Sequence, residues 1–125
     1  MPATYTIDVK RGLVFSKAQG KLNDADLVDH SKRVAADPEF KSDFNQLADF
    51  REVTSLEIST ETIKEIAADS PYGKGSRRAI VVNSPLAYGL SRIYRAMVDD
   101  QGSEIKVFKD YNQACQWLGI SPEAA

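Results

Sequence analysis

Residues 49–60 read Asp-Phe-Arg-Glu-Val-Thr-Ser-Leu-Glu-Ile-Ser-Thr and contain the junction on which the predicted fold depends. A short buried strand over 46–50 leads into this stretch, and Ser59 or Thr60 is placed to cap the helix that follows. In open α/β domains the carboxyl ends of the strands form the edge at which ligands and partners usually bind. The stretch therefore predicts an α/β domain and the edge at which it functions.

The N-terminal residues predict a β-hairpin. Tyr5, Ile7 and Val9 alternate with polar residues, a turn follows at 10–12, and a second, less regular alternating run spans 13–19.

Helix boundaries are marked by capping residues. Asn23 is placed to cap a first helix that stops before Pro38, and Ser84-Pro85 opens a third helix. Asp110 is placed to cap a last helix that ends at Gly119.

Two further strands are predicted, over 78–82 and around 105–107. The apolar run in the first is typical of a central strand covered on both faces. The third helix has an apolar stripe at helical spacing, formed by Leu86, Leu90, Ile93, Tyr94 and Met97. Alternating helices and strands imply parallel pairing through right-handed crossovers. We therefore expect residues 1–125 to form a single α/β domain, with a mixed, mostly parallel five-stranded sheet, an N-terminal hairpin and four helices.

The composition of the chain limits the classes of partner that we expect it to bind. The chain of 125 residues is 42% hydrophobic and 27% charged, and its net charge of -2 gives no broad attraction to nucleic acid or to anionic membranes. No segment is apolar and long enough to span a bilayer, and the N-terminus lacks the pattern of a secretion signal. We expect a cytoplasmic protein without a nucleic-acid partner, and a peripheral membrane contact stays open.

The sequence shows no recognisable set of catalytic residues. His30 has no metal-ligand spacing around it and no nucleophile spaced to use it, and Cys115 is expected to be a small apolar filler. The run 73–76 lacks the spacing of a phosphate-binding loop and precedes a strand. We expect no catalytic residue, no metal and no cofactor, and hence a protein that is not an enzyme.

Four polar residues are predicted to meet at the carboxyl edge of the sheet. Asp49 and Arg51 leave one strand, and Asn83 and Ser84 leave the next. Arg51 could pair with an anion held at the N-terminus of the third helix, or with Asp49 or Glu52 in water.

The outer side of the third helix carries Tyr88, Arg92 and Arg95 at spacings of four and three residues. This composition is typical of an interface or of a contact with acidic headgroups, and it is equally that of an arginine stem stacked on a ring. Self-association as a homodimer through this helix is a further hypothesis.

Short motifs along the chain resemble SpoIIAA-like proteins of the STAS superfamily. They are Gly20-Lys21-Leu22-Asn23, Ala48-Asp49-Phe50-Arg51, and Phe108-Lys109-Asp110 leading into Trp117-Leu118. The resemblance covers nearly the whole chain and implies the SpoIIAA-like beta-alpha superhelix.

In the signalling branch of that superfamily, the anti-sigma-factor antagonists, the pattern Asp-Leu-Ser-Gly-Val-Thr-Phe-Ile-Asp-Ser-Ser-Gly carries a phosphorylated serine. Aligned with it, this chain keeps Asp49, Val53, Thr54, an acid at Glu57 and a serine at Ser59. It departs from the pattern at Ile58 and Thr60. A second branch, akin to CRAL-TRIO lipid carriers, generally lacks the phosphosite and is suspected of holding small apolar or lipid-like ligands, and the chain looks closer to this branch.

Two functions follow as hypotheses. In the first, a small apolar or lipid-like ligand binds at the carboxyl edge of the sheet, oriented by Arg51, Asn83 or Ser84. In the second, a surface around Thr54, Ser55 and Ser59 docks a regulatory protein and is switched by phosphorylation of Ser59. The same serine equally fits the role of an ordinary helix cap.

Overall fold

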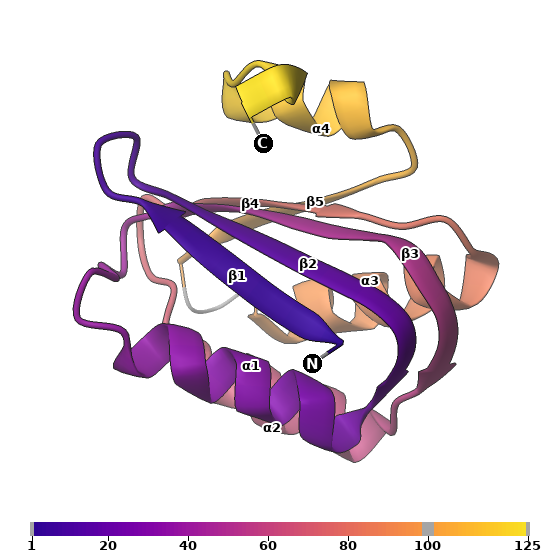
Figure 1. The fold of residues 1–125 in the computed structure, drawn as a ribbon. Coiled ribbons are helices and arrows are strands. Elements are labelled where there is room, and N and C mark those ends of the chain that lie inside the picture. Colours follow the sequence, from indigo (N-terminus) through magenta and orange to yellow (C-terminus); the bar gives the residue numbers. More distant parts are fainter. Residues whose placement is uncertain (1, 99–101, 125) are drawn as a thin grey trace.

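The strands and helices alternate in the predicted order. The computed structural model describes residues 2–98 and 102–124 (Figure 1). Its elements are β1 (Ala3–Asp8), β2 (Leu13–Asn23), α1 (Asp24–Ala36), β3 (Asn45–Glu57), α2 (Thr60–Ala68), β4 (Arg77–Val81), α3 (Pro85–Val98), β5 (Glu104–Phe108), α4 (Tyr111–Leu118) and a short 3-10 helix, η2 (Pro122–Ala124). No helix within these described residues is both long and apolar enough to cross a membrane.

The five strands form one mixed sheet in the order β1-β2-β3-β4-β5. β1 and β2 pair antiparallel as the predicted hairpin, and every other neighbouring pair is parallel. The predicted fold class is therefore confirmed.

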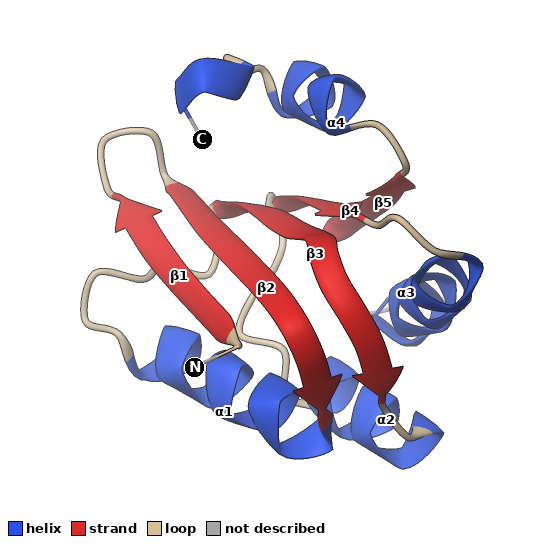
Figure 2. Cartoon of the chain, turned by 45° about the vertical axis from the view of Figure 1, so that its right-hand side comes forward, coloured by secondary structure: helices blue, strands red, loops and turns tan. Residues whose placement is uncertain are grey.

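Helices cover both faces of the sheet. α1, α2 and α3 lie against one face and α4 against the other (Figures 1 and 2). Ala79 and Val81 of β4 pack in the core on the α4 side, while Ile80 and Val82 pack in the core beneath α2 and α3. Cys115 is fully buried on the α4 side, as the sequence predicts for an apolar filler. Burial on two faces explains why β4 reads as an unbroken apolar run.

The helix caps form as predicted. The Asn23 side chain accepts a hydrogen bond from the Asp26 N–H at 2.9 Å, and the Asp26 carboxylate accepts one from the Asn23 N–H at 2.9 Å. This capping box satisfies two backbone donors at the start of α1. The Asp110 carboxylate likewise accepts from the N–H of Gln113, and α4 ends at Gly119 in the left-handed conformation, with a φ of 75°.

β3 is longer than predicted. The sequence places its end near Phe50, but the strand continues to Glu57. β4 pairs with β3 only as far as Asp49, whereas β2 follows β3 to the end with two register irregularities. Residues 19–23 and 50–57 therefore form a two-stranded projection, here called the β2–β3 extension, which curves toward α1 and α2 (Figure 2).

The β2–β3 extension was missed because its residues alternate only weakly in polarity. Phe50, Val53 and Leu56 pack with Leu22 and Leu27 beneath the extension, and this one-sided burial sustains the strand.

α3 turns a different face to the sheet than its large apolar residues predict. Leu86 is 56% exposed and Ile93 is 37% exposed, whereas Ala87, Tyr94 and Val98 are buried. Small Ala87 packs in the core under the helix, and the Tyr94 hydroxyl meets a buried hydrogen-bonding partner, Arg78. The prediction for Leu86 and Ile93 was wrong, and that for Tyr94 is confirmed.

Candidate functional site

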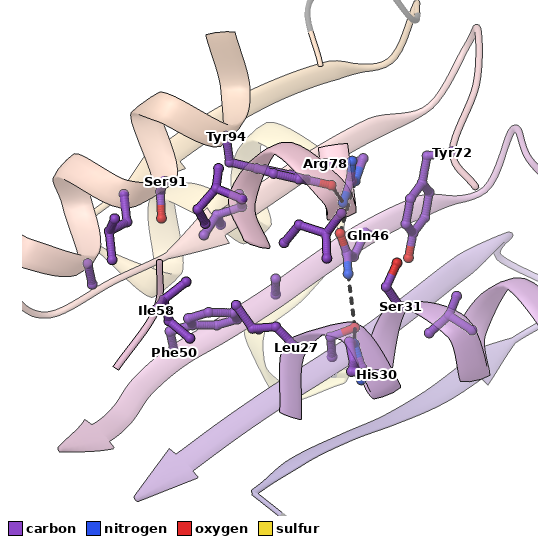
Figure 3. Close-up of a pocket in the computed structure, with 18 of the residues that line it drawn as sticks. Leu27, His30, Ser31, Gln46, Phe50, Ile58, Tyr72, Arg78, Ser91 and Tyr94 are labelled. Atoms are coloured by element: carbon purple, nitrogen blue, oxygen red, sulfur yellow. Dashed lines mark hydrogen bonds between the residues drawn. The ribbon is translucent and has the colours of Figure 1, made fainter. Parts of the chain in front are cut away.

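A cavity of about 110 Å³ lies between the sheet and helices α1, α2 and α3 (Figure 3). It begins at residues near the start of β3 and β4 and reaches the β2–β3 extension. Its wall is largely apolar, with Leu27, Phe50, Leu56, Ile58, Ile63 and Leu90 among the lining residues. A space of this size exceeds what one water needs by several-fold, and apolar cavities of comparable size, about 150 Å³, stay dry and bind small apolar molecules.

One end of the cavity is polar and is built around Arg78, which is only 5% exposed. Its guanidinium donates from Nε to Gln46 Oε1 at 3.0 Å, from Nη2 to Tyr94 Oη at 2.8 Å and from Nη1 to Ser70 Oγ at 3.3 Å. The ring of Tyr72 lies 4.1 Å from the guanidinium carbon. Arg78 points inward because it shares a face of β4 with Ile80, two residues further along the strand.

The polar network continues from Arg78 to α1. Gln46 donates from Nε2 to Ser16 Oγ at 2.9 Å, and Ser16 Oγ lies 3.0 Å from His30 Nε2. Figure 3 shows Gln46 between Arg78 and His30. Strands β2, β3 and β4 and helix α1 thus each contribute a polar side chain to one buried row.

His30 is held neutral. Burial is the largest cause of its lowered pKa, the charges of Arg33 and Arg78 act in the same direction, Asp29 opposes them, and together they bring the pKa to about 4. Ser16 brings a hydroxyl next to this imidazole, a pairing that sequence spacing did not predict. The buried Nδ1 of His30 has no hydrogen-bond partner within the described residues, so the third group that orients the base in a catalytic triad is missing there. A pKa near 4 also makes this imidazole a weak base at neutral pH.

Tyr72 also contributes to the polar end of the cavity. It is 4% exposed, and its hydroxyl finds no hydrogen-bond partner among the residues that the structure describes. Burial raises the pKa of Tyr72, so the phenol keeps its proton. Tyr72 and Ser31 point toward one another beside Arg78 (Figure 3).

The four residues predicted to meet at the carboxyl edge are brought together. Asp49 stands opposite Val81 in the parallel pair, and the Asn83 side chain donates to the carbonyl of Arg51. Ser84 Oγ accepts from the N–H of Ala87 at 3.1 Å, at the start of α3.

Asp49 and Arg51 lie outside the cavity and bind each other. Arg51 donates from Nε and Nη2 to the two oxygens of Asp49, both at 2.9 Å, and its guanidinium lies 3.9 Å from the ring of Tyr111 on α4. Burial disfavours the charged form of Asp49, but the hydrogen bonds from Arg51 outweigh it and lower the pKa. Of the two interpretations of Arg51, the structure shows the ion pair with Asp49, and the role of the four residues in ligand binding stays a prediction.

Ser59 caps α2. Its Oγ accepts from the Thr62 N–H at 3.2 Å and donates to Asp24 Oδ2 at 3.0 Å, and its own N–H donates to Asp24 Oδ1 at 2.8 Å. The hydrogen bond from the Ser59 N–H lowers the pKa of Asp24, so this carboxylate is charged at neutral pH. A phosphate on Ser59 would stand beside that negative charge.

This geometry predicts the outcome of three substitutions at Ser59. Ser59→Ala removes the cap and is expected to lower the free energy of unfolding by about 1 kcal/mol. Ser59→Asn keeps a neutral cap and should remain close to the wild type, whereas Ser59→Asp places a second carboxylate next to Asp24 and should be less stable than Ser59→Asn. Urea denaturation at low and high salt measures this, because the gap between the aspartate and asparagine variants must narrow as salt screens the repulsion. An aspartate variant more stable than the asparagine variant would favour the phosphosite.

The residues predicted as an interface lie on two surfaces. Arg92 lies 5.8 Å from the ring of Tyr88, Lys109 lies 4.8 Å from the same ring, and Arg95 is exposed. The stacked arrangement of arginine on Tyr88 is therefore present. Thr54 and Ser55 lie on the β2–β3 extension, where Ser55 pairs with Lys21. A protein partner at either surface stays a prediction.

The residues of the polar end were missed because they come from distant parts of the sequence and are not unusual in their local context. Counting alternate positions in the strands would have found two of them. Arg78 shares the parity of Ile80, and Gln46 shares the parity of Ala48 and Phe50. A polar residue at such a core-facing position is itself a signal.

Comparison with known proteins bears on the fold. No protein-family model and no curated protein sequence matches this chain. The chain is similar to the crystal structure of an uncharacterized protein of the DUF3478 family with a SpoIIAA-like fold from Shewanella loihica PV-4. The two share 20% sequence identity and superpose with a TM-score of 0.61 over 93% of each chain. The chain thus has the SpoIIAA-like fold that its sequence motifs predict.

Proposed function

We propose that this protein binds a small apolar or lipid-like molecule in the cavity between the sheet and helices α1, α2 and α3. The observation that carries the proposal is the cavity itself, with apolar walls and polar groups gathered at one end. Ligand sites have this composition, because apolar surface supplies affinity and a few polar groups fix orientation. The volume of about 110 Å³ suits a short ligand, since sites for drug-sized molecules measure roughly 300–1,000 Å³.

The proposed site only partly coincides with the predicted carboxyl edge. Phe50 and Leu56 lie beyond the point where β4 leaves β3, so the apolar end of the cavity belongs to that edge. Gln46 and Arg78 stand opposite each other near the start of their strands. The polar end of the cavity therefore lies on the same face of the sheet, toward the amino ends of the strands.

The proposal is one of binding without catalysis. The Ser16–His30 pair is the strongest argument for an enzyme, and the low pKa of His30 and its unpartnered Nδ1 weigh against it. Hydrolysis of a short ester that disappears in Ser16→Ala would contradict this part of the proposal.

An interaction module resembling the anti-sigma-factor antagonists is the alternative. The contacts of Ser59 with Asp24 and Thr62 favour a structural cap over a phosphorylated switch.

Filling the cavity provides the test. Hexan-1-ol is a neutral probe of suitable size, and its binding should shift the NMR signals of lining residues and raise the melting temperature. Ser91 lines the cavity from α3, and Ser91→Leu places a larger apolar side chain there. We expect this variant to fold and to bind hexan-1-ol at least about tenfold more weakly than the wild type, because the space is occupied.

A matched control comes from the same helix. Ala96 is exposed, so Ala96→Leu adds apolar bulk outside the cavity and should leave hexan-1-ol binding unchanged. Equal binding of hexan-1-ol by the wild type and by Ser91→Leu would overturn the proposed function.

A further inference from the structure

Arg78 is a buried charge without a counter-ion. It is 5% exposed, and no carboxylate within residues 2–98 and 102–124 lies within ion-pairing distance of 4.0 Å. Buried charges in proteins are normally paired, because removing an ion from water is costly unless an opposite charge compensates. Every side chain that hydrogen-bonds to Arg78 is formally neutral: Gln46, Ser70 and Tyr94.

The guanidinium also has spare hydrogen-bonding capacity. An arginine carries five N–H donors, and hydrogen bonds to Gln46, Ser70 and Tyr94 use three of them. One N–H on each terminal nitrogen has no assigned acceptor. Two N–H groups on the terminal nitrogens can donate to the two oxygens of one carboxylate, which is a bidentate geometry that arginine favours.

A second group at the same place lacks a partner. The ring of Tyr72 lies against the Arg78 guanidinium, and its buried hydroxyl, which points toward Ser31 (Figure 3), makes no hydrogen bond within the described part of the chain. A buried hydroxyl without a partner costs free energy, whereas the same hydroxyl can donate to an oxygen of a bound anion. Both Tyr72 and Arg78 line the cavity.

The rings around Arg78 reduce the cost of its burial without cancelling its charge. The guanidinium carbon lies 4.1 Å from the ring centre of Tyr72 and 5.2 Å from that of Tyr94. Each cation–π contact of this kind stabilises the guanidinium by less than the burial of an unpaired ion costs. The nearby His30 is neutral and supplies no negative charge. The polar end therefore keeps a net positive charge that faces the apolar part of the cavity.

We propose that the ligand of this cavity is a short amphipathic carboxylate, whose carboxyl group binds Arg78 and Tyr72 and whose hydrocarbon chain lies toward Leu27 and Phe50. The proposal rests on the proposed function, because it names the chemical class of the ligand for the same cavity. A singly charged carboxylate matches one arginine. A phosphate monoester would bring nearly two negative charges to a buried site with a single cation and would leave one of them uncompensated.

Comparing two probes of the same length tests the charge of the head group. Hexanoate and hexan-1-ol share a hydrocarbon chain, so the difference in their affinities reports the carboxylate alone. We expect the wild-type protein at neutral pH to bind hexanoate at least about tenfold more tightly than hexan-1-ol, measured by calorimetry and by NMR titration. The bound carboxyl group should also remain ionised to lower pH than in water, which an isotope label on its carbon detects.

Arg78→Met should abolish the preference for hexanoate over hexan-1-ol, because methionine fills similar space without charge. Arg77→Met is the matched control. Arg77 is the preceding residue, half-exposed, and bonded to Glu104 and the Trp117 carbonyl away from the cavity. The preference should survive in this control.

The possible results separate the two proposals. If the wild type binds hexan-1-ol but binds hexanoate no more tightly, the carboxylate assignment is overturned and the ligand-binding function stands. If Arg78→Met retains the preference, the carboxylate does not bind at Arg78 and the assignment is likewise overturned. If neither probe binds the wild type, the ligand-binding function fails and the assignment fails with it. The comparison of probes on the wild type needs no variant, so a failure of Arg78→Met to fold leaves the test intact.

Discussion

The Leu47→Ala variant is expected to lose about 2–5 kcal/mol of unfolding free energy, which is the range for deleting a fully buried leucine side chain. Leu47 is 2% exposed and lies in the middle of the sheet, in the core formed with α4. For a domain of this size the loss corresponds to a fall in melting temperature of roughly 8–19 °C. Calorimetry or urea denaturation measures it.

Leu86→Ala makes the same chemical change at an exposed position and serves as the control. Leu86 is 56% exposed on α3, and alanine is the better helix former, so the change in stability should stay within about 0.5 kcal/mol. Similar losses at both positions would contradict the orientation of α3, since the sequence pattern alone places Leu86 in the core.

Acid should destabilise this protein through His30. The unfolded imidazole takes up a proton as the pH falls below about 6.5, whereas burial lowers the folded pKa to about 4. Between these values the unfolded chain binds more protons than the folded one, so the free energy of unfolding falls as the pH falls. The stabilisation present above pH 6.5 is lost by about pH 4, and a displacement of this size corresponds to about 3 kcal/mol.

His30→Gln isolates this contribution from that of the carboxylates, which titrate in the same range. The difference in stability between the wild type and this variant should shift against the wild type on acidification, by about 3 kcal/mol. Because the chain contains one histidine, its NMR titration can be followed without ambiguity. A midpoint near 6.5 in the folded protein would show that the imidazole is not buried as described.

Local chemistry predicted the fold well. Asn23, Ser59 and Asp110 each cap the helix predicted for them, because a cap depends on the few residues around it. The unbroken apolar run of β4 and the alternation of helices with strands predicted the parallel sheet.

Two features depend on packing and could not be read from the sequence pattern. On α3, the large side chains of Leu86 and Ile93 mark one stripe, but the sheet packs against the neighbouring stripe of Ala87 and Tyr94. In β3, residues after Asp49 stay in a strand because β2 continues beside them, which is a long-range contact. A hydropathy pattern records which side chains are apolar. It does not record which arrangement of those side chains packs without gaps, and that packing decides which face is buried.

The candidate site was harder to predict than the fold. Its polar end joins Ser16, His30, Gln46, Tyr72 and Arg78, which meet only after β2, β3 and β4 are aligned. Asp49, Arg51, Asn83 and Ser84 were found from the sequence because they follow strands directly, and the structure does bring them to one edge. The rule that ligands bind at the carboxyl ends of parallel strands locates an edge of the sheet. It does not say which face of the sheet carries a cavity.

The position of α4 on the face opposite the cavity has a consequence for the evolution of this chain. Leu47, Val81 and Cys115 hold that face together without lining the cavity, so mutations at Leu27, Phe50 or Ser91 leave this half of the core undisturbed. Selection can therefore alter which molecule is recognised while the architecture is inherited unchanged. Descendants of such a chain are free to diverge in specificity before they lose the ability to fold.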